Sequence, residues 1–282
     1  IPLVDKNTYV LLNRGDTIAV FQLESGGMQT LCRQFVVETI EHIIALLAIY
    51  RPGPMEFIPT FVGCKKGLQP IVYDHPKMEP ILKETYGIML YQEQIMEVVQ
   101  KLAGFTLGHA DIVRRAIGKK KMDIMEKEKI NFIQGCKETN NIEPELAEQI
   151  WTKINKFAGY GFNKSHSAAY GMVSYRTAYL EANYPQEYMA AVLTSELGNA
   201  EKVTFLINAC KDMGIEIRPP DVNKSDTNFS VDGKNIVFGL GAIKGLGESA
   251  SNAIISEREK NGPYKDMVEF LERVGGSVNS KA

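Results

Sequence analysis

The sequence has 282 residues, 44% of them hydrophobic and 23% charged, which is typical of a globular chain with one large or two smaller domains. It has no apolar run long enough to span a membrane, and its first ten residues lack the order of a secretory signal, so we expect a cytoplasmic protein. The formal net charge of −2 excludes a general attraction to polyanions. Any site for a polyanion must therefore come from local clusters of Lys and Arg.

The cysteines are spread at wide intervals without a C-x-x-C pair, so we expect neither a disulfide framework nor a zinc site. The first residue is Ile rather than Met, from which we expect a fragment or a cleaved product.

Helical periodicity covers most of the chain. Apolar residues recur at helical spacing from Met28 to Tyr50, which predicts one long helix that ends at Arg51-Pro52-Gly53-Pro54. The same spacing predicts further helices over residues 88–102, 109–117, 122–136, from Pro144 onward, 167–182, from Pro185 onward and 200–213.

The pattern changes at Ile215. Residues 215–221 are extended in character, and NFSVDGKNIVF alternates around Asp232-Gly233, which predicts a β-hairpin. We therefore predict a mainly α fold with a helical domain over residues 1–215. Residues 216–282 are predicted to form a second domain with the β-hairpin and a glycine-rich loop followed by a helix.

Residues 111–121, DIVRRAIGKKK, form a basic cluster with one acidic residue. Guanidinium groups bind phosphate oxygens bidentately and ammonium groups add point charge, so the cluster is a candidate phosphate site. The alternative is a solvated helix face, which is the commoner fate of a run of charges.

The segment FAGYGFNKSHSAAY, residues 157–170, combines stackable rings with many hydrogen-bond donors. Lys164, Ser165, His166 and Ser167 are predicted to lie directly before a helix, whose N-terminal amides favour an anion such as a triphosphate. Alternatively Ser165 or Ser167 is an N-cap, and the rings belong to the core.

Residues 240–258 match a helix-hairpin-helix, in which Gly245 and Gly247 would let backbone amides approach a DNA phosphate. The alternative is a plain turn. The glycine spacing differs from that of a dinucleotide-binding fingerprint, and no βαβ pattern surrounds it.

Several catalytic motifs are absent from the sequence. It contains no phosphate-binding P-loop, no H-E-x-x-H, no G-x-S-x-G and no pair of aspartates spaced D-x-D. We therefore expect that the chain itself lacks carboxylates for two-metal chemistry.

Six strings carry a resemblance to a known family: FQLES (21–25), RPGP (51–54), YGIMLYQEQ (86–94), RRAIGKKK (114–121), FAGYGFNKSHSAAY (157–170) and GLGAIKGLGE (239–248). In this order they closely resemble the alpha subunit family of bacterial DNA polymerase III, the C-family replicative polymerases. The resemblance covers nearly the whole chain.

The resemblance implies a fingers domain, which binds incoming nucleotide and template, and the start of the following domain with its first helix-hairpin-helix. In the family, three aspartates of the palm domain bind two Mg²⁺ ions. We expect that the palm and a second hairpin motif fall outside this chain, so that the chain alone is inactive. The full-length parent would carry out 5′–3′ DNA synthesis and work with a sliding clamp and a proofreading exonuclease.

The resemblance also implies roles for individual residues. The residues expected to bind the deoxynucleoside triphosphate are Arg114, Arg115, Lys164, Ser165, His166 and Tyr170. Those expected to bind primer–template DNA are Arg51, Lys119, Lys120, Lys121, Lys244, Gly245 and Gly247. Two other functions stay open for the isolated chain: a stand-alone DNA-binding module that uses the hairpin, and a scaffold for protein assembly.

Overall fold

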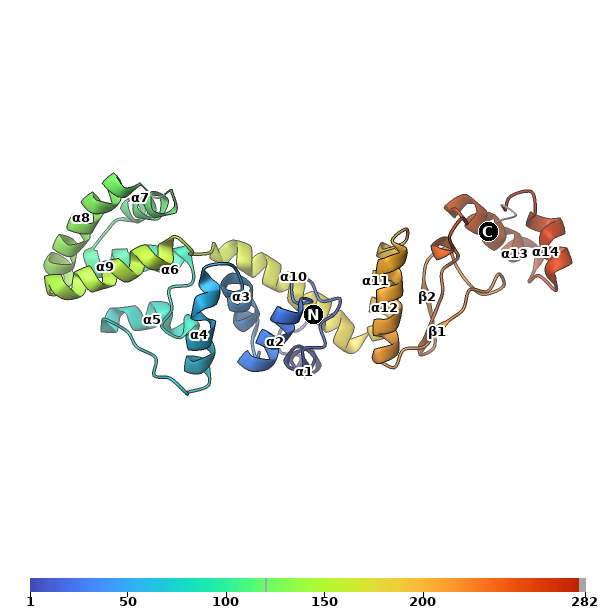
Figure 1. The fold of residues 1–282 in the computed structure, drawn as a ribbon, viewed down its shortest axis with the longest axis horizontal. Helices are drawn as coiled ribbons and strands as arrows, with labels where there is room; N and C mark the ends of the chain where they lie inside the picture. The colour runs from blue at the N-terminus through green and yellow to red at the C-terminus, as the bar shows by residue number, and fades with distance from the viewer. Residues whose placement is uncertain (120, 279–282) are drawn as a thin grey trace. The chain divides into compact units, whose positions relative to one another are not determined.

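The computed structural model describes residues 1–119 and 121–278, and its internal contacts divide the chain into two units. Unit 1 comprises residues 1–17 and 21–176, and unit 2 comprises residues 18–20 and the chain from Thr177 onward. Most of the described chain is helical, with one small sheet, so the predicted mainly α fold is confirmed (Figure 1). The predicted domain boundary between residues 215 and 216 stays a prediction.

Unit 1 consists of helices joined by turns. Its α-helices are α1 (Lys6–Arg14), α2 (Gly26–Phe35), α3 (Ile40–Ile49), α4 (Ile58–Lys65), α5 (Glu79–Leu82), α6 (Gln92–Ala103), α7 (Leu107–Gly118), α8 (Met122–Asn140) and α9 (Pro144–Ala158). Short 3₁₀ turns lie at η1 (Pro54–Phe57), η2 (Pro76–Met78) and η3 (Lys83–Thr85). Helix α10 (Lys164–Asn183) begins in unit 1 and ends in unit 2.

The single helix predicted over residues 28–50 is wrong, because the structure breaks it into α2 and α3. Helix α2 ends where Val36 adopts a left-handed conformation, with φ 64°. Helix α3 starts after Thr39, whose hydroxyl accepts a hydrogen bond from the His42 amide. Both helices bury an apolar face, so the apolar spacing continues across the break.

Helices α6 to α9 share one core in unit 1. Val98 of α6, Val113 of α7 and Phe132 of α8 are fully buried in it, and Trp151 of α9 packs against Phe132 with 5.3 Å between ring centroids. Helices α8 and α9 are in contact, and Figure 1 shows α9 turning away at an angle from the end of α8. As the sequence predicts, Pro144 lies in the first turn of α9.

Unit 2 contains α11 (Pro185–Ser195), α12 (Ala200–Asp212) and a three-stranded sheet of order β1-β3-β2, formed by β1 (Ile217–Arg218), β2 (Ser230–Asp232) and β3 (Asn235–Val237). Strands β2 and β3 pair antiparallel across Gly233, which has φ 66°, so the predicted hairpin is confirmed. Strand β1 pairs in parallel with β3, with Ile217 opposite Ile236. Leu193 and Leu206 pack with Ile236 in the core under this sheet.

The rest of unit 2 contains the 3₁₀ turn η4 (Leu240–Ala242) and helices α13 (Glu248–Asn261) and α14 (Met267–Val274). Leu240, Ile254 and Val274 form its small core together with Tyr264, whose hydroxyl donates to the Ile254 carbonyl at 2.8 Å. This core positions the glycine turn that precedes α13.

Candidate functional site

Residues 157–170 run from the end of α9 into α10, and Asn163 caps the N-terminus of α10. Its side-chain oxygen accepts from the His166 amide at 2.8 Å, and its carbonyl accepts from the Ser167 amide at 3.1 Å. Lys164, Ser165 and His166 therefore form the first turn of α10 rather than the residues before it. Neither Ser165 nor Ser167 is the N-cap.

Helix α10 packs closely on α3, and this packing decides which of its side chains face outward. The Ser167 hydroxyl is buried and donates to the Ile44 carbonyl at 2.6 Å. One turn later, a Cβ on Gly171 would lie 2.7 Å from the Ile44 side chain, so the close approach requires glycine. With Ser167 and Gly171 turned inward, His166 and Tyr170 lie on an exposed face.

An aromatic row extends along this exposed face. The His166 ring lies 5.4 Å from the Phe162 ring and 4.2 Å from the Tyr170 ring, between centroids. Tyr170 in turn lies 5.3 Å from Phe21 and is 39% exposed. The row offers ring surface on which a planar group could stack.

A short backbone pairing ties this segment to the start of α6. The Phe162 amide donates to the Leu90 carbonyl at 3.0 Å, and the Gln92 amide donates to the Phe162 carbonyl at 2.9 Å. Tyr91 lies between these bonds and is 2% exposed. The first turns of α6 and α10 are therefore held near each other.

Arg51 braces the same region from the RPGP turn. Its guanidinium lies over the Phe162 ring, with Cζ 4.2 Å from the centroid. It also donates to the Tyr160 carbonyl at 2.8 Å and to the Ala48 carbonyl at 3.0 Å. Arg51 thus braces the RPGP turn against this segment, and its DNA contact stays a prediction.

Asp111 interacts with both arginines of the basic cluster on α7. Its Oδ1 accepts from Arg114 at 2.6 and 2.9 Å, and its Oδ2 lies 2.9 Å from Arg115. The hydrogen bond from Arg114 holds the pKa of Asp111 below its usual value. Arg114 also donates to the Gln92 side chain at 3.2 Å, which links the cluster to the start of α6.

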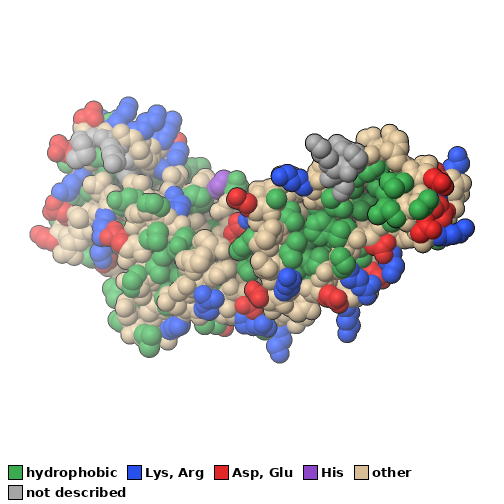
Figure 2. Space-filling view, turned by 45° about the vertical axis from the view of Figure 1, so that its right-hand side comes forward, with side chains coloured by type: hydrophobic (Ala, Val, Ile, Leu, Met, Phe, Trp, Pro, Cys, Tyr) green, Lys and Arg blue, Asp and Glu red, His purple; other side chains and the backbone are tan. Residues whose placement is uncertain are grey.

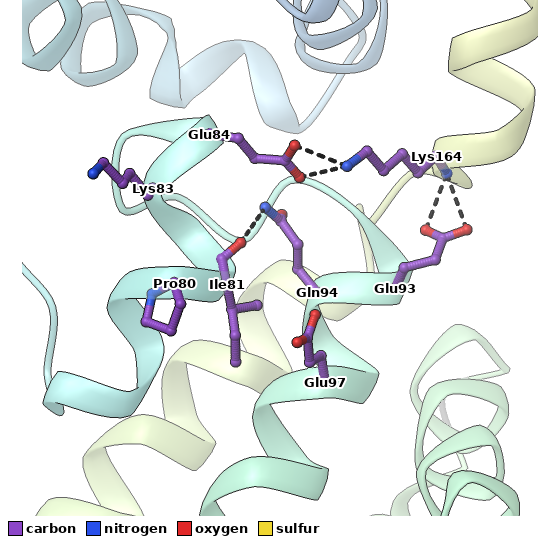
Figure 3. A pocket seen from close by; sticks show the side chains of 8 residues that line it. All are labelled: Pro80, Ile81, Lys83, Glu84, Glu93, Gln94, Glu97 and Lys164. Carbon is purple, nitrogen blue, oxygen red and sulfur yellow. Dashed lines mark hydrogen bonds and ion pairs between the residues drawn. The ribbon is translucent and has the colours of Figure 1, made fainter.

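Lys164 lies at the edge of a hollow of about 440 Å³ lined by residues of α5, η3 and α6 (Figure 3). Its ammonium lies 2.6 and 2.8 Å from the two carboxylate oxygens of Glu84. Its backbone amide donates to both oxygens of Glu93, at 3.1 and 3.0 Å. Glu93 thus occupies the helix terminus where the sequence predicts an anion, and Glu84 binds the side chain of the first residue of α10.

The end of the basic cluster is exposed to solvent. Lys119 and Lys121 are both exposed, and Lys120 lies outside the described residues. Figure 2 shows Lys and Arg side chains gathered at the upper left, where Figure 1 places α7 and α8. An exposed basic surface is suited to phosphate contacts, and these lysines stay predicted DNA ligands.

The glycine turn of unit 2 leaves its backbone accessible. Gly245 has φ 90°, and Gly247 is the N-cap of α13. A Cβ added to either glycine would meet no other atom within 4 Å, and Lys244 beside them is exposed. Backbone amides and one cation could therefore reach a phosphate here.

Glu84, Glu93 and Asp111 are the contacts that sequence reasoning missed. The two glutamates are far from Lys164 in the sequence, so no local pattern pointed to them. Asp111 stood inside the basic motif at i,i+3 and i,i+4 spacing from the arginines, which was a usable signal. Within residues 1–119 and 121–278, no group of three or more His, Cys, Asp or Glu residues could hold a metal ion.

Comparisons with known proteins agree with this arrangement of motifs. A family model for the bacterial DNA polymerase III alpha subunit finger domain matches residues 1–140, and one for a helix-hairpin-helix motif matches residues 214–282. DNA polymerase III subunit alpha of Chlamydia trachomatis is 51% identical over 273 residues, which are 97% of this chain. The chain belongs to the bacterial DNA polymerase III alpha subunit family. The resemblance predicted from the sequence is therefore confirmed.

Other alpha subunits of the family give the same result. The relative from Pseudomonas aeruginosa is 50% identical over 282 residues, which are 97% of this chain, and the one from Thermus aquaticus is 47% identical over 286 residues, which span the whole chain. The chain spans only 22 to 24% of the length of these relatives. None of the helices in the described ranges combines the length and apolar character of a membrane span.

Proposed function

We propose that this chain is the fingers region, with the start of the following domain, of a polymerase that extends a primer 3′ end against a DNA template. Its membership of the DNA polymerase III alpha subunit family supports this function. The whole polymerase would transfer nucleotides, and this chain would bind the incoming deoxynucleoside triphosphate and primer–template DNA.

The observation that carries the proposal is the exposed aromatic row beside basic side chains. A nucleobase could stack on the rings of His166 and Tyr170. Lys164 lies in the same first turn as His166, with the exposed Ser165 hydroxyl between them, and Arg114 reaches the region through Gln92. Rings and cations gathered around the start of α10 suit a ligand with a base at one end and phosphates at the other.

Phosphoryl transfer depends on positioning and on neutralising charge at the β and γ phosphates. Arg114, Arg115 and Lys164 would supply positive charge, while the aspartates of the palm domain in the longer polymerase would bind two Mg²⁺ ions. The isolated chain would therefore bind substrates without catalysing. A sliding clamp and a proofreading exonuclease would act with the full-length protein.

Anisotropy of labelled primer–template DNA across a salt series tests the DNA contact. We expect Lys119→Ala/Lys121→Ala to weaken binding and to reduce the log–log salt slope by about 0.9 for each lost phosphate contact. The matched control is Lys66→Ala/Lys101→Ala, which removes the same charge from exposed sites on unit 1. Equal losses in the two double variants would refute a specific role for Lys119 and Lys121.

Primer extension tests whether the isolated chain binds substrates without catalysing, as proposed. The isolated chain with Mg²⁺, primer–template and all four deoxynucleotides should give no extension, whereas the full-length polymerase should. Robust extension by the 282-residue chain would contradict the proposal that catalysis needs the palm.

A second candidate function is a stand-alone DNA-binding module, and the accessible backbone at Gly245 and Gly247 favours it. In that case Gly245→Pro would abolish DNA binding, because proline cannot adopt a φ near 90°. Arg114→Ala would then change nothing. Absence of any salt-dependent DNA binding would instead support the assembly scaffold.

A further inference from the structure

The Lys164–Glu84 pair joins a predicted phosphate ligand to a carboxylate of the chain itself. Both oxygens of Glu84 lie within 2.8 Å of the Lys164 ammonium, and the two side chains are 36% and 40% exposed. The ammonium also lies 5.3 Å from the centroid of the buried Tyr91 ring. The contact draws Lys164 toward η3 and the hollow beside it (Figure 3).

The surroundings of the pair are acidic. Glu84, Glu93 and Glu97 line the hollow together with Lys83 and Lys164 (Figure 3). Glu93 already accepts the Lys164 backbone amide. A phosphate that approaches Lys164 therefore competes with Glu84, which binds the same ammonium. The carboxylates of Glu93 and Glu97 add negative charge in the same hollow.

We propose that Glu84 is an internal competitor for Lys164, which the triphosphate must displace before the lysine can bind a phosphate oxygen. The inference rests on the nucleotide-binding function proposed above. Carboxylate and phosphate accept the same charge-assisted hydrogen bonds from an ammonium group, so the exchange replaces one anion with another. No covalent bond changes.

The small free energy of an exposed ion pair favours exchange of Glu84 for phosphate over a permanent Lys164–Glu84 pair. An exposed ion pair contributes little to stability, so a ligand with several negative charges displaces Glu84 at modest cost. Lysine is suited to such an exchange because its ammonium is a compact charge on a flexible stem. Glu84 is thus a positioning residue that holds Lys164 near the start of α10 and lowers nucleotide affinity.

The test measures binding of dATP with Mg²⁺ to the 282-residue chain by NMR, which detects weak affinities. Lysines carry ¹³C-methyl labels, and Lys164→Arg assigns the Lys164 signal. Glu84→Gln should shift that signal in the absence of ligand. It should also lower the dissociation constant for dATP roughly two- to fivefold, which corresponds to the free energy of an exposed ion pair. The matched control is Glu97→Gln, which removes a charge from the same hollow and should change affinity less than about 1.5-fold.

A double-variant comparison separates exchange from a general charge effect. In a Lys164→Met background, Glu84→Gln should no longer tighten binding, because the competed ammonium is gone. An equal gain in this background, or in Glu97→Gln, would overturn the exchange.

The outcomes also separate this inference from the proposed function. If the chain binds dATP and Lys164→Met weakens binding while Glu84→Gln has no effect, the exchange alone is refuted. If Glu84→Gln shifts the Lys164 signal but no form of the chain binds dATP, the pair exists and nucleotide binding is refuted, and the exchange with it.

Discussion

The Arg51 guanidinium lies over the Phe162 ring, with its Cζ 4.2 Å from the ring centroid, and so links the RPGP turn to the segment before α10. The same guanidinium donates to the carbonyls of Ala48 and Tyr160. One side chain therefore joins the end of α3, the RPGP turn and the start of the candidate site.

We predict that Arg51→Ala lowers the free energy of unfolding by about 1 to 2 kcal/mol, because it removes two hydrogen bonds and a cation–π contact. Arg51→Lys should lose nearly as much, since an ammonium cannot reproduce the planar fork. Urea unfolding measures both. The exposed control Lys66→Ala should stay within about 0.5 kcal/mol, and a similar loss there would show that Arg51 braces nothing.

Gly53 and Gly67 both have positive φ, of 100° and 68°, but differ in their surroundings. A Cβ on Gly53 would lie 2.3 Å from the Tyr160 ring, whereas one on Gly67 would meet nothing within 4 Å. We expect Gly67→Ala to cost about 1 kcal/mol from backbone strain and Gly53→Ala clearly more. Thermal unfolding of the two variants gives the comparison, and equal costs would mean that Tyr160 moves aside freely.

Glu93 lies in the first turn of α6 and also accepts the first amide of α10. A carboxylate near two helix N-termini interacts favourably with both dipoles. We predict that Glu93→Ala lowers the free energy of unfolding by about 0.5 to 2 kcal/mol, with Glu93→Gln in between, since it keeps one acceptor oxygen. Glu97→Ala, on an exposed position of the same helix, is the control and should cost little.

His42 makes stability depend on pH. Its Nδ1 accepts from the Glu38 amide at 3.1 Å and its Nε2 lies 3.0 Å from the Tyr86 hydroxyl. Burial, with Lys65 nearby, lowers the pKa of His42 below its usual value of 6.5. Below that pH the unfolded chain binds a proton that folded His42 resists, so stability should fall as the pH is lowered from about 7 toward 5.

Unfolding free energies between pH 7 and pH 5 test this linkage. His42→Asn keeps an acceptor for the Glu38 amide but cannot titrate, so its stability should fall less steeply than that of the parent chain. The control is His166→Asn, at an exposed position. Identical slopes for His42→Asn and the parent chain would contradict the assigned cause.

Much of the fold could be predicted because single residues end or begin its elements. Pro144 and Gly233 act through their own backbone preferences, and both lie at the element boundaries that the sequence predicts. The break between α2 and α3 was missed for the opposite reason. Val36 is not a residue that favours a positive φ, so no local sequence signal predicts a helix end there.

The sequence predicted which residues belong to the candidate site better than it predicted the side chains that bind them. A donor-rich segment at a helix start is visible in the sequence, and Lys164 and His166 do share the first turn of α10. The carboxylates that bind Lys164 come from η3 and α6, and their proximity depends on the pairing of Leu90 and Gln92 with Phe162. No local sequence rule describes a contact of that range.

The pairing of Phe162 with the segment before α6 has a consequence for how the chain can be divided. The finger-domain match ends at residue 140. However, the Leu90 carbonyl and the Gln92 amide form their hydrogen bonds with the backbone of Phe162, and the core of α6 to α8 includes Trp151 of α9. A protein cut at residue 140 would expose apolar surface and unpaired backbone groups. The segment that matches the finger-domain family model, residues 1–140, is therefore shorter than the segment that must fold together, which extends at least to Phe162.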